Sequence, residues 1–125
     1  MSPRILVENT SGVTVARLVD SQIVADDVVL EVEEQLNDFA ASHGAEPIVL
    51  SFHEVQFMSS TILAMLLRFT RSVSKAGGRL KLCGIGPHLM EVFKITRFDR
   101  LFDIHAEEWS AIDAFESGQA VLPKA

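Results

Sequence analysis

The fold is decided by one stretch of the chain, Ile48–Leu63, which reads IVLSFHEVQFMSSTIL. It opens with a nearly unbroken apolar run, which is typical of a strand buried on both faces of a parallel sheet. A loop over His53–Met58 follows. Three consecutive hydroxyl side chains, Ser59–Thr61, come next, and such side chains are favoured at the start of a helix. The stretch therefore predicts a buried strand, a loop, and an α-helix that begins where the loop ends.

Apolar spacing and turn residues predict the elements on either side of this stretch. Before it we expect two strands, Arg4–Glu8 and Val13–Leu18, around a turn at Asn9–Gly12. A connector at Ser21–Val24 leads to a helix that begins at Asp26 and stops at Gly44 in the C′ role. After it we expect a helix end at Gly77-Gly78, a strand at Arg79–Cys83 and a helix from Pro87 to about Ile95. A strand at Leu101–Ile104 follows. The last predicted helix starts at Glu107-Glu108, carries Trp109, Ile112 and Phe115, and closes at Gly118. The predicted fold class is α/β, a mixed and mostly parallel sheet with an N-terminal hairpin and about four helices packed against it.

The length of 125 residues predicts a single domain over residues 1–125, since one domain usually has about 100–200 residues. We expect its core at about residues 5–117 and a C-terminal tail at 118–125. The chain has one cysteine, Cys83, and shows neither a secretion signal nor an apolar run of about 20 residues. These features predict a cytoplasmic protein without a membrane span.

Charge is distributed unevenly along the chain. The net charge of −6 argues against bulk binding of nucleic acid. Residues 1–60 carry 2 basic and 10 acidic side chains, whereas residues 61–125 carry 9 basic and 7 acidic ones. This asymmetry indicates either electrostatic steering of a charged partner or simply solvated helix faces.

No catalytic or metal-binding motif is visible. Gly84-Ile85-Gly86 lacks the remaining residues of a phosphate loop, and there is no Gly-x-Ser-x-Gly elbow. The histidines stand singly at positions 43, 53, 88 and 105, without the spacing of metal ligands. Cys83 falls in a predicted inner strand and has no neighbouring base, so we interpret it as a small core residue. We expect neither an enzyme nor a bound cofactor or metal.

The hydroxyls of Ser59–Thr61 have two interpretations. One hydroxyl is explained by capping of the helix, because it can accept a hydrogen bond from a free backbone amide. The others offer a phosphoacceptor, since a phosphate there would meet free amides and the positive end of the helix dipole. The residues alone leave both interpretations open.

The stretch Ile48–Leu63 resembles the signature of STAS domains, the family of anti-sigma factor antagonists and related sulfate-transporter modules. The resemblance continues through RLKLCG at 79–84 and VFKITRFDRLFDI at 92–104, and it covers about residues 5–117. It implies a STAS fold and a serine or threonine phosphoacceptor at the helix start, in the register of Thr61, with Ser60 second. Ser59 stands where the family usually has aspartate, and Ile62 stands where it usually has glycine.

The resemblance implies a regulatory protein that binds an anti-sigma factor of the histidine-kinase-like serine kinase type and is switched by phosphorylation. The partner surface is expected to include Ser59, Ile62, Arg68 and Arg71, and a homodimer is compatible with this function. A scaffold without the switch and a small-ligand-binding module near His53–Thr61 are the alternatives. Ile62 belongs either to the core or to the recognition surface, and helical spacing to Leu66 favours the core.

Overall fold

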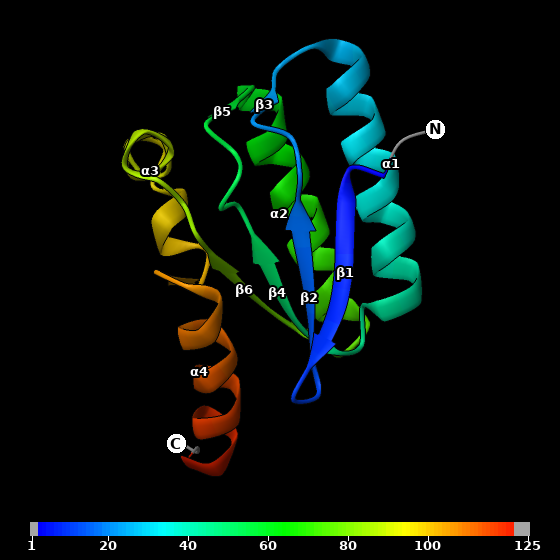
Figure 1. Ribbon diagram of the computed structural model, residues 1–125, viewed down its shortest axis with the longest axis vertical. Helices are drawn as coiled ribbons and strands as arrows, with labels where there is room; N and C mark the ends of the chain where they lie inside the picture. The colour runs from blue at the N-terminus through cyan, green and yellow to red at the C-terminus, as the bar shows by residue number, and fades with distance from the viewer. Residues whose placement is uncertain (1–2, 122–125) are drawn as a thin grey trace.

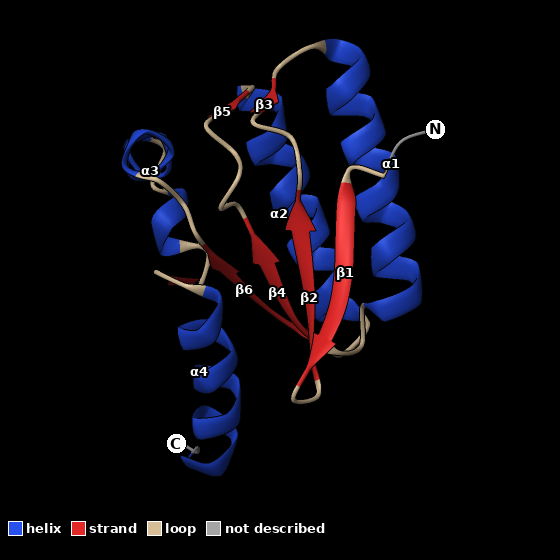
Figure 2. Ribbon diagram, in the orientation of Figure 1, coloured by secondary structure: helices blue, strands red, loops and turns tan. Residues whose placement is uncertain are grey.

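A twisted sheet forms the centre of the molecule, with strands in the order β1-β2-β4-β6-β7 (Figures 1 and 2). The computed structural model describes residues 3–121, and for 117–121 it describes the backbone only. The strands of this sheet are β1 (Ile5–Thr10), β2 (Val13–Leu18), β4 (Pro47–Ser51), β6 (Arg79–Cys83) and β7 (Ile104–His105). The pair β1–β2 is antiparallel and the other pairs are parallel. The predicted mixed, mostly parallel sheet with an N-terminal hairpin is therefore confirmed.

Helices cover both faces of the sheet. On one face lie α1 (Asp26–His43), α2 (Ser60–Lys75) and α3 (Pro87–Ile95), and on the other lies α4 (Glu108–Val121). Alternate residues of β4 enter the two cores, with Ile48 and Leu50 under the first three helices and Val49 under α4. The apolar run at 48–50 is thus explained by a strand that is buried on both sides.

Three details of the C-terminal part differ from expectation. Only Ile104 of the predicted strand at Leu101–Ile104 belongs to β7, which continues to His105 and pairs with the end of β6, and Phe98–Arg100 forms a 3-10 helix, η1. The last helix does not close at Gly118 but continues to Val121. Of the apolar residues expected on this helix, Trp109 is exposed, since α4 packs on the sheet through Ala111 and Phe115.

Gly44 ends α1, but not in the left-handed conformation expected for the C′ role. Its φ is −61°, which any residue adopts. A Cβ at Gly44 would lie 2.4 Å from the Ala40 carbonyl oxygen, and a Cβ at Gly78 would lie 1.9 Å from the Gly44 oxygen. Gly78 is therefore required because the turn after α2 packs against the backbone of the turn after α1, whereas Gly44 is required by the last carbonyls of its own helix.

The two-residue strands β3 (Gln22–Ile23) and β5 (Phe57–Met58) form a second small parallel sheet. We expected a plain connector and a plain loop in these places, and both expectations were incomplete. The pair lies at the end of the molecule where α2 begins (Figure 2). It therefore connects the segment before α1 to the segment before α2.

Candidate functional site

The start of α2 is organised by Ser59. This residue is the N-cap, and its Oγ accepts a hydrogen bond of 3.2 Å from the Thr61 backbone amide. Its carbonyl oxygen accepts from the Ile62 amide at 3.0 Å. The capping interpretation of one hydroxyl is confirmed, and Ser59 is the residue that provides it. Within residues 3–121 we find no acceptor for the Ser60 amide, so one donor remains open to a ligand or to solvent.

The small β3–β5 sheet holds this helix start in place. The Ser59 amide donates to the Ile23 carbonyl oxygen at 2.9 Å. Two residues before Ile23, the Ser21 carbonyl oxygen accepts hydrogen bonds from the backbone amides of Gln56 at 2.7 Å and Phe57 at 3.1 Å. The backbone that leads into the hydroxyl cluster is thus fixed to the segment before α1. A run of two residues has no hydrophobic period, so the sequence contains no signal for these strands.

The side chains of the cluster point in different directions. Ser60 and Thr61 are exposed, whereas Ser59 is half-buried by its capping role. Ile62 has 0% of its surface exposed and lies in the main core with Leu66 and Phe69. Of the two alternatives for Ile62, the structure shows the inward one. The hydroxyls free for modification are therefore those of Ser60 and Thr61, the two expected from the sequence.

The expected arginines lie farther along α2. At a rise of about 1.5 Å per residue, Arg68 is about 10 Å beyond Thr61 along the helix axis. Its Nη2 lies 2.9 Å from Glu33 Oε2, so it joins α2 to α1. Arg71 is exposed and has no ion-pair partner among residues 3–121. The structure therefore brings Ser59–Ile62 together, but the arginines form a separate part of the same helix surface.

An apolar surface that we did not predict includes Phe57, two residues before the first of the hydroxyls. The Phe57 ring is 45% exposed and contacts the His88 imidazole edge to face, with ring centroids 5.3 Å apart. A cavity of about 350 Å³ opens at these two rings. It is lined by the β4–β5 loop with Phe57, by the β6–α3 loop and by the start of α3: His53, Val55, Gln56, Phe57, Gly84, Gly86, Pro87, His88 and Leu89. The unusual exposure of a phenylalanine depends on the β3–β5 pairing, so sequence reasoning missed this surface.

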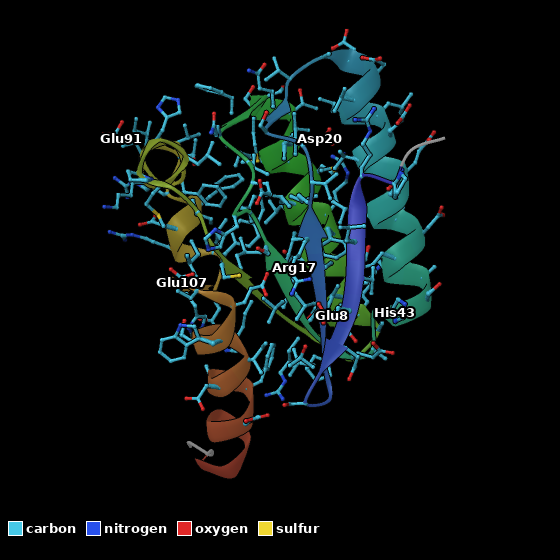
Figure 3. The ribbon with its side chains drawn as sticks, in the orientation of Figure 1. Glu8, Arg17, Asp20, His43, Glu91 and Glu107 are labelled. Carbon is cyan, nitrogen blue, oxygen red and sulfur yellow. The ribbon has the colours of Figure 1, made fainter. Side chains whose placement is uncertain are left out.

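A second polar cluster connects the sheet with the start of α4. Arg17 Nε lies 2.6 Å from Glu108 Oε2, and Arg17 Nη1 lies 2.7 Å from Glu8 Oε1. Figure 3 shows Glu8 and Arg17 on the sheet and Glu107 beside the start of α4. The hydrogen bond from Arg17 lowers the pKa of Glu108, which therefore stays ionised. His53 Nε2 lies 2.9 Å from Glu107 Oε1, and this hydrogen bond raises the pKa of His53.

Cys83 does not take part in this chemistry. It is buried under α4, and burial raises the pKa of its thiol to about 11. A thiol with that pKa is almost fully protonated at neutral pH and is a poor nucleophile. The interpretation of Cys83 as a small core residue is confirmed.

Comparison with known proteins gives consistent matches. The family model described as "STAS domain" matches residues 5–111. BtrV of Bordetella bronchiseptica, named as a candidate anti-sigma factor antagonist, is 30% identical over 74 residues, which span 59% of this chain and 64% of that protein. An anti-sigma F factor antagonist of Paenibacillus polymyxa is 25% identical over 118 residues, which span 93% of this chain and 97% of that protein.

A solved structure agrees with these matches at the level of the fold. The Bacillus cell fate determinant SpoIIAA, in its phosphorylated form, superposes with a TM-score of 0.62 at 24% identity, covering 89% of this chain and 98% of SpoIIAA. Within the described residues of the present chain, no helix combines the length and the apolar character needed to cross a bilayer.

Proposed function

The chain belongs to the STAS domain family, and on that premise we propose that it is an anti-sigma factor antagonist, a regulator rather than an enzyme. It acts in the cytoplasm by binding an anti-sigma factor, which frees the sigma factor. The observation that carries this proposal is the start of α2, which is hydrogen-bonded to the segment before α1 and where exposed Ser60 and Thr61 follow the exposed Phe57 within four residues. Such a combination suits protein recognition, because an aromatic anchor next to polar groups is typical of interface centres.

Phosphorylation is the proposed switch, with Thr61 as the acceptor and Ser60 second. A phosphate adds about 1.5 to 2 negative charges at pH 7. The first turn of α2 holds no acidic side chain, so nothing on the helix itself repels the dianion. The helix dipole stabilises an anion there by about 0.3–1 kcal/mol. We propose that the added charge disrupts the partner interface, while the helix start tolerates it.

The kinase in this proposal is the anti-sigma factor itself, of the histidine-kinase-like serine kinase type. Incubation of the protein with that kinase and ATP should add one phosphate, detected by intact mass. Phosphopeptide mapping should place it on Thr61 or Ser60, and Thr61→Ala with Ser60→Ala should abolish it. Ser72→Ala is the matched control, since Ser72 is an exposed hydroxyl on the same helix. Modification confined to Ser72 or Ser74 would contradict the assignment.

Binding to the anti-sigma factor tests the function directly. Thr61→Glu should weaken the complex, because it places a charge at the proposed contact, while Ser72→Glu should leave affinity unchanged. If both variants bind as the wild type does, the start of α2 is not the contact surface. A complex that never forms with any anti-sigma factor of the same organism would refute the proposal as a whole.

The arginines of α2 are proposed to steer the partner. Exposed charges at the rim of an interface change the association rate more than the affinity. Exchange of Arg71 for glutamate should therefore change the on-rate at low salt, and added salt should reduce the difference. Arg68 is held by Glu33, so its exchange should also loosen α1 from α2 and needs a stability measurement beside it. An unchanged on-rate for Arg71→Glu would assign that side chain to a solvated face only.

A ligand-binding module is the second candidate function, supported by the cavity beside His53 and His88. Its volume of about 350 Å³ lies at the lower end of the range for small-molecule sites. It lies beyond the carboxyl ends of β4 and β6, where ligands of parallel sheets usually bind. A small-molecule screen by thermal shift, repeated with Gly86→Trp to fill the cavity, distinguishes this function from protein binding. Hits that survive the cavity-filling substitution would argue against the cavity as the site.

A further inference from the structure

Two exposed patches of opposite charge lie on α1 and at the end of α3. The acidic patch consists of Leu30, which is 55% exposed, surrounded on the outer face of α1 by Asp26, Asp27 and Glu34. These carboxylates lie three or four residues from Leu30 and therefore share its helix face. None of the three has an ion-pair partner among residues 3–121. Their neighbours Glu31 and Glu33 are neutralised by Arg4 and Arg68.

The basic patch has the same design with the opposite sign. Ile95, at the end of α3, is 81% exposed, and Leu101, just after η1, is 55% exposed. Around them lie the exposed cations of Lys94, Arg97 and Arg100, which form no ion pair within the described part of the chain. Negative side chains are also near: Glu91 lies one turn earlier on the outer side of α3 (Figure 3), and Asp99 is half-buried in η1. The cations nevertheless outnumber them.

We propose that the acidic patch of one copy binds the basic patch of a second copy. Leu30 in one patch and Ile95 and Leu101 in the other are exposed aliphatic side chains among charged ones, which is the arrangement of an interface core with a polar rim. The named charges of the acidic patch are all negative, and the basic patch carries three cations against two carboxylates, so the two patches complement each other better than either complements a copy of itself. A symmetric pairing through identical surfaces is thereby disfavoured, and a head-to-tail contact is favoured.

The positions of the patches determine the type of assembly. Figure 1 shows α1 and α3 on opposite sides of the molecule, so one copy can bind a neighbour at each side. Head-to-tail contacts of this kind produce chains or rings rather than closed pairs. Stable interfaces bury roughly 1,200–2,000 Å², and a contact through a few exposed side chains on each copy is expected to be weaker and reversible. This inference goes beyond the proposed function, because neither patch includes Ser59–Thr61.

Light scattering after gel filtration, or sedimentation velocity, tests the contact. At about 0.01 M salt, where charges act over about 30 Å, the average mass should rise with protein concentration above the 13.8 kDa of one chain. At about 1 M salt, where the screening length is about 3 Å, the mass should fall back to that of one chain. A constant mass of one chain at low salt, over the full concentration range, would overturn the proposal.

Two blocked variants make the test specific. The first removes the acidic patch (Asp27→Asn, Leu30→Gln, Glu34→Gln), and the second removes the basic patch (Lys94→Gln, Ile95→Gln, Arg100→Gln). Each variant alone should remain a single chain, while their mixture should form a complex of two copies that cannot grow. The control Asp113→Asn with Glu116→Gln changes exposed acids on α4 and should associate like the wild type. A mixture that stays monomeric, or a control that also loses association, would refute the pairing of these patches. Thermal melts exclude misfolding as the cause.

Discussion

Replacement of Ile62 by glycine tests how the start of α2 is fixed to the core. The Ile62 side chain is fully buried against the same core that contains Leu66 and Phe69. Removal of a buried aliphatic side chain of this size costs about 2–5 kcal/mol. Glycine in a helix costs about 1 kcal/mol more. The expected total is about 3–6 kcal/mol, a large part of the 5–15 kcal/mol that stabilises a typical domain.

Urea denaturation followed by circular dichroism measures this loss. Ala64→Gly is the matched control, because Ala64 is exposed on the same helix and its exchange costs only the helix term of about 1 kcal/mol. Ile62→Val, at about 0.5–1.5 kcal/mol, keeps the series measurable if the glycine variant fails to fold. A loss for Ile62→Gly no greater than that for Ala64→Gly would refute the argument that Ile62 anchors the helix.

Three further outcomes are expected. Ser59→Ala should lower stability by about 1 kcal/mol in thermal melts, since the Thr61 amide loses its acceptor; an unchanged melting temperature would contradict the capping role. Because the pKa of His53 is raised, the His53–Glu107 pair should stabilise the fold fully below about pH 6.5 and lose its effect as pH rises through the raised pKa. Glu107→Gln should remove this dependence in melts over that pH range, and equal pH profiles for the two proteins would argue against it. Cys83 should react with a thiol reagent at pH 8 only when the protein unfolds, because its pKa is about 11; rapid labelling of the folded protein would contradict its burial.

Sequence reasoning predicted those elements whose signal is local. The apolar run before Ser51 and the hydroxyls at Ser59–Thr61 identify β4 and α2 because burial on both faces and helix capping depend on residues close in the chain. Pro87 identifies the start of α3 and Gly77 the end of α2, because these signals are local as well. The expected acceptor residues also lie where predicted, on an exposed helix start.

Features that depend on distant residues were missed. The strands β3 and β5 are defined by pairing between segments more than 30 residues apart, and neither has a pattern of its own. The ion pair between Arg17 and Glu108 joins residues 91 positions apart. Phe57 lies in β5, one of these two strands, so the apolar surface at Phe57 and His88 could not be derived from residue types alone.

The contact between the turns at Gly44 and Gly78 has a consequence for any search for new partners. Both positions lack room for even a methyl group, because the obstacle in each case is a backbone oxygen. At Gly78 the obstacle belongs to the neighbouring turn and at Gly44 to the helix that this residue ends, so both obstacles are parts of the fold and not of a partner surface. A library randomised at these two positions and selected for any partner would therefore return glycine at both, while the exposed residues around α2 remain free to diversify.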